Sequence, residues 1–323
     1  MILVTGGAGY VGSHYLLHER GRGREAVVLD SLARGHRKAV LGALLVEGNV
    51  ADRAILDRIF TGFPIEAVVH FAAFAYVGES VCDPGLYFRN NVVSTLALLE
   101  AMVSHGVSRL LFSSSCATYG VPESVPIHEQ HVQKPINPYG ESKLACERML
   151  EAFDRAHGLR YAALRYFNAA GADEEGRIGE SHDPETHLIP LALQVAAASR
   201  AELDIFGADY PTADGTCVRD YVHVMDLAAA HGLALERLMD GSPSFVLNLG
   251  SERGHSVREV VRACERATGR SIRMAEQPRR PGDPAVLVAS ADRAHQELGW
   301  RPRYGDLEAI ARTAWRWLQD PRF

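Results

Sequence analysis

The sequence of 323 residues predicts an α/β protein in which a parallel, doubly wound sheet is joined by a smaller, mixed α/β lobe. Three observations lead to this fold class. Short apolar segments alternate with longer helical patterns, a glycine-rich turn follows the first apolar segment, and an acidic residue ends the second. Alternating strands and helices are typical of parallel sheets, whose crossover connections are helices. A chain of this length can bury a large core and form two lobes.

The first unit is predicted to be a strand over residues 2–5, a glycine turn and a helix over residues 11–20. Gly6, Gly9 and Gly12 are spaced three apart, which lets the backbone turn tightly and lets a pyrophosphate approach the amides of a helix start. The next strand, residues 26–29, ends in Asp30. A carboxylate at that place accepts ribose hydroxyls and repels a 2′-phosphate. The unit therefore predicts a Rossmann-type dinucleotide site that prefers NAD over NADP. Because the cation Arg34 lies nearby, NADP stays open as an alternative cofactor.

More strand and helix units follow the first pair. Strands are predicted over residues 44–47, 67–70 and 109–113, and helices over residues 52–60 and 86–104. Ligands of doubly wound sheets bind at the carboxyl ends of the strands. The segments at those ends are Asn49, residues 71–75 and residues 113–115. Their common location predicts one cofactor cleft.

A further helix is predicted from Pro138 to about residue 156, with Asn137 as its cap. Tyr139 and Lys143 then lie one turn apart on the same face. A phenol ionises near pH ~10, and an ammonium beside it favours the phenolate, so the pair is predicted to act as a base near neutral pH. The hydroxyl of Ser115 would share a hydrogen bond with the substrate and the tyrosine. For the Tyr-x-x-x-Lys spacing alone, a solvated helix face is the competing interpretation.

Composition narrows the classes of function. The net charge of −6 lacks the basic excess of a nucleic-acid-binding protein, and apolar runs stay well below the ~20 residues of a membrane span. The five cysteines are scattered, which predicts reduced thiols in a cytoplasmic protein and neither a disulfide framework nor a zinc site. His14 and His18 have one-turn spacing but lack the glutamate of a zinc-protease motif, so no metal is expected.

Nine segments together carry a family resemblance over nearly the whole chain. They are TGGAGYVGS (5–13), VVHFAA (68–73), VGES (77–80), FSSSCATYG (112–120), NPYGESK (137–143), LRYFNAAGA (164–172), IFGADYPTADGTCVRDYVHVMDLA (205–228), NLGS (248–251) and RRPGD (279–283). The sequence resembles the extended short-chain dehydrogenase/reductases, the NAD-dependent epimerase/dehydratase family. Within that family, the stretch over residues 210–223 is most similar to the 4-epimerases of UDP-sugars.

The resemblance implies a role for particular residues. Tyr139 would be the catalytic base and acid, Lys143 its electrostatic partner and a ribose ligand, and Ser115 the third member. Besides the three glycines and Lys143, the residues implied around NAD are Tyr10, Val11, Asp30, Ser31, Arg34, Gly35, Asn49, Val50, Phe71, Ala72, Ala73, Asn90, Tyr166 and Phe167. Besides Ser115 and Tyr139, those implied around the nucleotide-sugar are Asn168, His187, Leu188, Phe206, Arg219, Arg280, Asp283 and Leu287. A diphosphate needs cationic or bidentate donors, which agrees with the two arginines, although either could instead be a surface ion-pair residue.

Four positions depart from the pattern of the family. Asn49 replaces an Asp that binds the adenine amino group, and an amide oxygen can accept the same hydrogen bond. Ala75 replaces a Lys near the pyrophosphate, which would weaken cofactor retention, and His187 replaces an Asn. A Tyr at position 287 is associated with restriction to UDP-glucose and UDP-galactose, and a small residue with acceptance of N-acetylated sugars. Leu287 is intermediate in size, so N-acetylated sugars stay open.

The activity implied is that of an isomerase of galactose metabolism, which interconverts UDP-glucose and UDP-galactose through a 4-keto intermediate with bound NAD. Three alternatives stand beside it: epimerisation of an N-acetylhexosamine or pentose, a 4,6-dehydratase, and an NAD-sensing protein without chemistry. Cys116 and Ala117 stand where dehydratases carry Asp-Glu, and sensors typically lack the Tyr/Lys pair, so the last two are disfavoured.

The same resemblance implies how the lobes and subunits are arranged. Residues 1–165 would bind NAD, with a return segment near residues 222–245, and residues 166–323 would bind the UDP-sugar. Helices over residues 86–104 and 139–157 would pair with their mates in a homodimer, unless they only cover the sheet.

Overall fold

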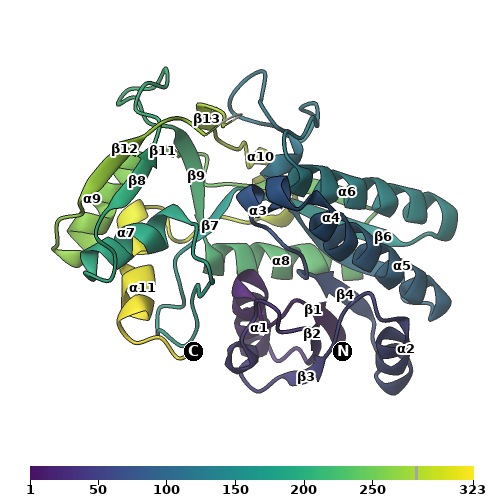
Figure 1. Ribbon diagram of the computed structural model, residues 1–323. Helices are drawn as coiled ribbons and strands as arrows, with labels where there is room; N and C mark the ends of the chain where they lie inside the picture. The colour runs from purple at the N-terminus through teal and green to yellow at the C-terminus, as the bar shows by residue number, and fades with distance from the viewer. Residues whose placement is uncertain (281–282) are drawn as a thin grey trace.

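A sheet of parallel strands forms the centre of the protein (Figure 1). In this computed structural model, which describes residues 1–280 and 283–323, seven strands have the order β10-β6-β5-β4-β1-β2-β3. Their bounds are Ile2–Thr5 (β1), Ala26–Asp30 (β2), Leu44–Glu47 (β3), Ala67–His70 (β4), Arg109–Ser115 (β5), Arg160–Tyr166 (β6) and Phe245–Leu249 (β10). The order changes direction at β1, as a doubly wound sheet requires, and the predicted fold class is confirmed.

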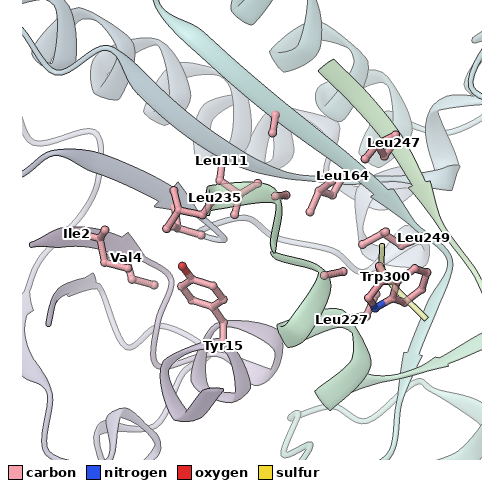
Figure 2. Close-up of a cluster of buried hydrophobic side chains, with 14 of the residues drawn as sticks. Ile2, Val4, Tyr15, Leu111, Leu164, Leu227, Leu235, Leu247, Leu249 and Trp300 are labelled. Atoms are coloured by element: carbon pink, nitrogen blue, oxygen red, sulfur yellow. The ribbon is translucent and has the colours of Figure 1, made fainter. Parts of the chain in front are cut away.

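Helices cover both faces of this sheet because alternate strand residues point to opposite sides. One face packs against α1 (Tyr10–Gly21), α8 (Val224–Met239) and α10 (Asp292–Leu298). Figure 2 shows part of this layer, where Ile2 and Val4 of β1 lie with Tyr15 of α1 and Leu235 of α8. Leu3, between them in sequence, packs on the other face. That face is covered by α2 (Arg53–Gly62), α5 (Ser94–Ser104) and α6 (Pro138–His157).

A second lobe has its own core between α7 (Leu188–Ala196), α9 (Val257–Thr268) and α11 (Leu307–Gln319). Its strand β9 (Val218–His223) pairs with three others: β7 (Asn168–Ala170), β11 (Gly254–Ser256) and β13 (Val286–Leu287). A separate parallel pair joins β8 (Leu203–Phe206) to β12 (Met274–Gln277). Figure 1 shows this lobe to one side of the main sheet, with its strands β7 and β9 next to α8.

The helix predicted over residues 86–104 is present as one continuous helical run, but it begins two residues earlier, at Pro84, and contains a π-helical segment. The structure has α3 (Val77–Cys82), α4 (Pro84–Tyr87) and a π-helical segment, η2 (Phe88–Val93), before α5. The wider turn places the buried side chain of Asn91 between two other segments. Its amide exchanges two hydrogen bonds with the backbone of Phe74 and donates a third to the hydroxyl of Ser142 of α6. π segments of this kind are frequent at functional sites. Two short 3₁₀ turns complete the elements, η1 (Arg37–Val40) and η3 (Cys116–Thr118).

The chain returns from the second lobe to the main sheet. Helix α8 packs against α1, and β10 adds to the edge of the sheet beside β6, with Phe245 opposite Ala162. The RRPGD segment spans positions 281 and 282, which lie outside the described residues. Among the helices that the structure describes, none combines the length and the apolar character that a membrane crossing requires.

Candidate functional site

The glycine turn after β1 leaves no room for a side chain at Gly6 or at Gly12. Gly6 has a φ of +71°, and a Cβ there would lie 2.4 Å from the backbone nitrogen of Ala72. A Cβ on Gly12 would lie 2.3 Å from the carbonyl oxygen of Gly6. Helix α1 begins directly afterwards at Tyr10, so its first amides are available to an anion. The turn therefore has the form of a phosphate-binding site.

Asp30 fixes the segment after β2 beside this turn. Its carboxylate accepts hydrogen bonds from the amide of Ala8 at 2.9 Å and from that of Leu32 at 2.8 Å. Burial raises the pKa of Asp30, and the two amides oppose that rise. A carboxylate has further lone pairs, so Asp30 can also accept hydroxyl groups of a ligand.

The other residues predicted around NAD lie at or near the carboxyl edge of the sheet. Phe71, Ala72 and Ala73 follow β4, Asn49 and Val50 follow β3, and Ser31 and Gly35 follow β2. Asn49 is exposed, and its amide oxygen already accepts the amide of Ala51. Asn90 lies in η2 and donates to Asn91. Arg34 is paired with Glu79 of α3, so its charge is already neutralised and it gives little support to NADP.

Helix α6 places the predicted catalytic pair. The Asn137 side chain accepts the amide of Gly140 at 2.9 Å, and Pro138 begins the helix, as the sequence predicts. One turn further, the ammonium of Lys143 donates to the carbonyl oxygen of Ser113 at 2.8 Å. Lys143 is 3% exposed, and burial lowers its pKa to about 8.

The phenol of Tyr139 lies in a more apolar setting than the sequence suggests. Burial raises the pKa of Tyr139 above its ordinary value, whereas the side chain of Ser115 lowers it. The ring of Tyr87 stands edge-on to that of Tyr139, with 6.4 Å between centroids. The direction of this shift is opposite to the expected one, because burial of the phenol is its largest cause while the ammonium of Lys143 is bound to the backbone of β5.

Polar groups at the ends of β5 and β6 complete this cluster. Ser113 and Tyr166 share a hydrogen bond of 2.6 Å. Phe167 is buried directly after β6. Ser115 ends β5, and its oxygen accepts the amide of Ala117 at 3.2 Å. The structure therefore brings Tyr139, Lys143 and Ser115 to one edge of the sheet.

A buried ion pair behind the cluster was missed by the sequence reasoning. Glu147 of α6 and Arg165 of β6 are 2.6 Å apart, with side chains 3% and 6% exposed. Glu147 also accepts the hydroxyl of Ser114, and Arg165 donates to the hydroxyl of Tyr119 at 2.8 Å. The sequence contains a signal for this ion pair: Arg165 lies near the end of an apolar run, and Glu147 lies one turn beyond Lys143.

The residues predicted for a nucleotide-sugar meet in pairs in the second lobe. Arg219 is ion-paired with Asp283, and it lies opposite Leu287 where β9 pairs with β13. The guanidinium of Arg280 lies 4.0 Å from the centroid of the Phe206 ring. The side-chain amide of Asn168 donates to the backbone of Asp220.

Leu287 connects this lobe to the catalytic edge. It packs against the buried cluster that contains Phe167 and Tyr119, and Cys116 packs against the same cluster. Cys116 follows Ser115 directly. The side chain at position 287 therefore lies within one packing layer of the end of β5.

His187 precedes Leu188, the first residue of α7, and belongs to a group of paired charges. Its Nδ1 lies 2.7 Å from Glu180 and 2.9 Å from Glu185, and His182 lies 3.1 Å from Glu180. Burial opposes protonation of His187, but the two carboxylates raise its pKa well above the ordinary value. His187 therefore carries a positive charge at the start of α7. The charges of these four side chains pair with one another.

Comparisons with known proteins point in one direction. The profile of the NAD dependent epimerase/dehydratase family matches residues 2–250. The chain is 51% identical over 319 residues to a UDP-glucose 4-epimerase of Halalkalibacterium halodurans, with 99% of this chain and 96% of the relative covered.

Two solved structures share the fold. The UDP-glucose 4-epimerase of Brucella ovis in complex with NAD has a TM-score of 0.95, with 51% identity and 97% of each chain covered. The enzyme of Stenotrophomonas maltophila, with bound NAD and formylated UDP-arabinopyranose, has a TM-score of 0.95, with 41% identity and 98% and 97% of the two chains covered.

Proposed function

The chain belongs to the NAD dependent epimerase/dehydratase family, and we propose that it is a UDP-glucose 4-epimerase that inverts C4 with bound NAD. The observation that carries the proposal is the identity of about half of all residues, over nearly the full length, with UDP-glucose 4-epimerases. The cluster of Tyr139, Lys143 and Ser115 at the carboxyl edge of a doubly wound sheet supports it, since that edge is where such folds bind ligands.

The residues present fit a dinucleotide. The backbone at Gly6 and Gly12 is packed so closely that no Cβ could be added, which leaves the amides at the start of α1 open to a pyrophosphate. Asp30 would accept the hydroxyls of the adenosine ribose. When bound, NAD supplies a ring that takes a hydride from C4 and returns it, and its positive charge lowers the pKa of a nearby phenol.

Tyr139 would move the proton in this reaction. Its phenolic oxygen would take the proton of the C4 hydroxyl, and it would return a proton to the C4 oxygen once the 4-keto sugar has turned its other face. Ser115 would hydrogen-bond the same sugar oxygen and orient it. Lys143, fixed to the carbonyl oxygen of Ser113, would hold a positive charge near the phenolate.

The second lobe would hold the UDP portion, leaving the hexose free to turn. Arg280 supplies a cation suited to a diphosphate, and Arg219 would offer its guanidinium beside Asp283, with which it is paired. The charge of His187 at the start of α7 is already balanced by Glu180 and Glu185. Asn168 and Phe206 offer an amide and an aromatic face. In this division of labour, residues 1–165 and the return segment near residues 222–245 bind NAD, and residues 166–323 bind the UDP-sugar.

A direct assay tests the proposal. Purified protein is expected to convert UDP-glucose to UDP-galactose without added NAD, because we expect the cofactor to stay bound during purification. Binding of NAD without any epimer would instead support the sensing alternative, and loss of water from the sugar would support a dehydratase. UDP-N-acetylglucosamine and UDP-xylose, run in parallel, rank the sugars.

The side chain at position 287 is proposed to set the sugar range. Leu287 leaves more room than a Tyr would, and it packs in the layer beside Ser115. Leu287→Tyr is therefore expected to lower kcat/KM for UDP-N-acetylglucosamine by at least ~10-fold, by steric exclusion, and to leave that for UDP-glucose within about threefold. Equal effects on both sugars would contradict this role. Val286→Ile, at the neighbouring position of β13, is the control.

We also propose that the protein is a homodimer. Val77, Val81, Phe88, Val93 and Leu96, on α3, η2 and α5, are exposed large apolar residues, and such surfaces mark protein interfaces. Leu96→Arg is expected to shift the protein from dimer to monomer in light scattering, whereas Val132→Arg, at an exposed apolar loop position, should not. A monomeric wild-type protein would contradict the proposal.

A cytoplasmic location is the remaining proposal. The five cysteines are all free in the structure, which suits a reducing compartment.

A further inference from the structure

Two segments flank the glycine turn on opposite sides. Strand β1 lies between β2 and β4, so the segments that follow β2 and β4 pass on either side of the turn that follows β1. On the β2 side, a Cβ on Gly35 would lie 2.9 Å from Ala8. On the β4 side, a Cβ on Gly6 would lie 2.4 Å from the backbone nitrogen of Ala72. The turn therefore lies between these two segments, which stand as walls on either side of it.

One ion pair joins the two walls. The Nη2 atom of Arg34, from the β2 side, donates to both carboxylate oxygens of Glu79, from the β4 side, at 2.6 and 2.7 Å. The guanidinium also lies over two rings of the β4 segment, 4.5 Å from the centroid of Phe74 and 4.3 Å from that of Tyr76. The side chains of Arg34 and Glu79 are 26% and 34% exposed, so water screens this pair only partly.

The acidic partner is held in place before any ligand binds. The hydroxyl of Tyr87, a fully buried residue, lies 2.8 Å from Glu79 Oε2. The same hydroxyl accepts the amide of Tyr76 at 2.9 Å, which ties Glu79 to the segment on which Arg34 stacks. A carboxylate that is oriented in advance loses little conformational freedom when it forms an ion pair. This ion pair therefore contributes more binding free energy than one between mobile surface side chains.

We propose that Arg34 and Glu79 form a strap across the glycine turn, and that this strap slows the release of the cofactor. The inference rests on the proposed function in so far as the turn binds NAD. A ligand whose pyrophosphate is held by the turn at Gly6–Tyr10 has a wall on each side, and the pair between the walls must open before the ligand can leave. Arg34 and Glu79 are thus positioning residues and take no part in the chemistry.

The experiment measures exchange of cofactor. Protein loaded with radiolabelled NAD is chased with excess unlabelled NAD, and the retained label is followed over time. Arg34→Met keeps the apolar stem on both rings and removes the charge, and Glu79→Gln keeps an acceptor for Tyr87. Each variant is expected to shorten the half-life of bound NAD by about tenfold, the scale of one charge-assisted contact.

Two further proteins separate the strap from a general loosening. The double variant Arg34→Met/Glu79→Gln should exchange no faster than either single variant, because both remove the same contact. Arg37→Met is the matched control, since Arg37 follows in the same segment and forms an exposed pair with Glu47 of β3; its half-life should stay within about twofold of the wild type.

Exchange of NAD at the wild-type rate in Arg34→Met and Glu79→Gln would contradict the proposed strap. A longer half-life of bound NAD would contradict it too, because it would mean that the ion pair hinders binding of the cofactor. An equal acceleration in Arg37→Met would attribute the effect to the segment as a whole, which also overturns it. A protein that contains no NAD after purification and also takes up no labelled NAD would contradict the proposed function instead, so the two failures are distinguishable.

Discussion

Tyr139→Phe is expected to lower turnover of UDP-glucose by at least ~100-fold while binding of UDP survives. The change removes only the phenolic oxygen, and the ring that packs edge-on against Tyr87 stays. Because the substrate's diphosphate would be held by residues of the second lobe, the loss should appear in kcat and not in the dissociation constant of UDP.

Turnover of NAD-loaded protein and calorimetry with UDP measure the two quantities. Tyr161→Phe is a matched control, since Tyr161 is a buried phenol near the opposite end of β6, away from the cluster. It should keep turnover within about threefold. Unchanged turnover in Tyr139→Phe would remove this residue from the mechanism.

Arg165→Met should lower the free energy of unfolding by roughly 3–5 kcal/mol, the largest loss of stability that we expect from a single change. The substitution leaves Glu147 as an unpaired carboxylate in a site that is 3% exposed. It also removes a donor from the hydroxyl of Tyr119, which links this ion pair to Asn248 of β10.

Urea titrations followed by circular dichroism measure the loss. The double variant Arg165→Met/Glu147→Leu should recover part of it, because replacing both charges removes the unpaired group. Arg148→Met, on the helix that carries Glu147, is the control. Arg148 forms an exposed pair with Glu151, so its loss should cost less than about 1 kcal/mol. Equal losses in Arg165→Met and Arg148→Met would show that burial of the pair is not what matters.

Local patterns predicted five of the seven strands of the main sheet. Strands β1, β3 and β4 have the predicted bounds, β2 and β5 extend further than predicted, and β6 and β10 were not predicted. The π-helical segment within residues 86–104 could not be predicted, because Asn91 there contacts Phe74 and Ser142, which are distant in the sequence. Hydrophobic periodicity is insensitive to one extra residue in a turn.

The candidate site was predictable in its residue types and less so in its electrostatics. Spacing places Tyr139 and Lys143 on one face of a helix, and α6 has them there. The upward shift in the pKa of Tyr139 comes first from burial of the phenol, and Tyr166, Cys116 and Tyr87, which lie on other elements, add to it. Glu79 lies in the VGES segment, to which the sequence assigned no role. Its partner Arg34 lies far away in the sequence, in the segment after β2.

The late arrival of β10 affects how the chain can fold during synthesis. Strand β6 pairs with β5 on one side, and on the other with β10, which leaves the ribosome only after much of the second lobe. Until then, β6 presents a bare edge of backbone donors and acceptors, which is a template for association between chains. A fragment cut after residue 165 would keep that edge permanently, so we expect it to aggregate.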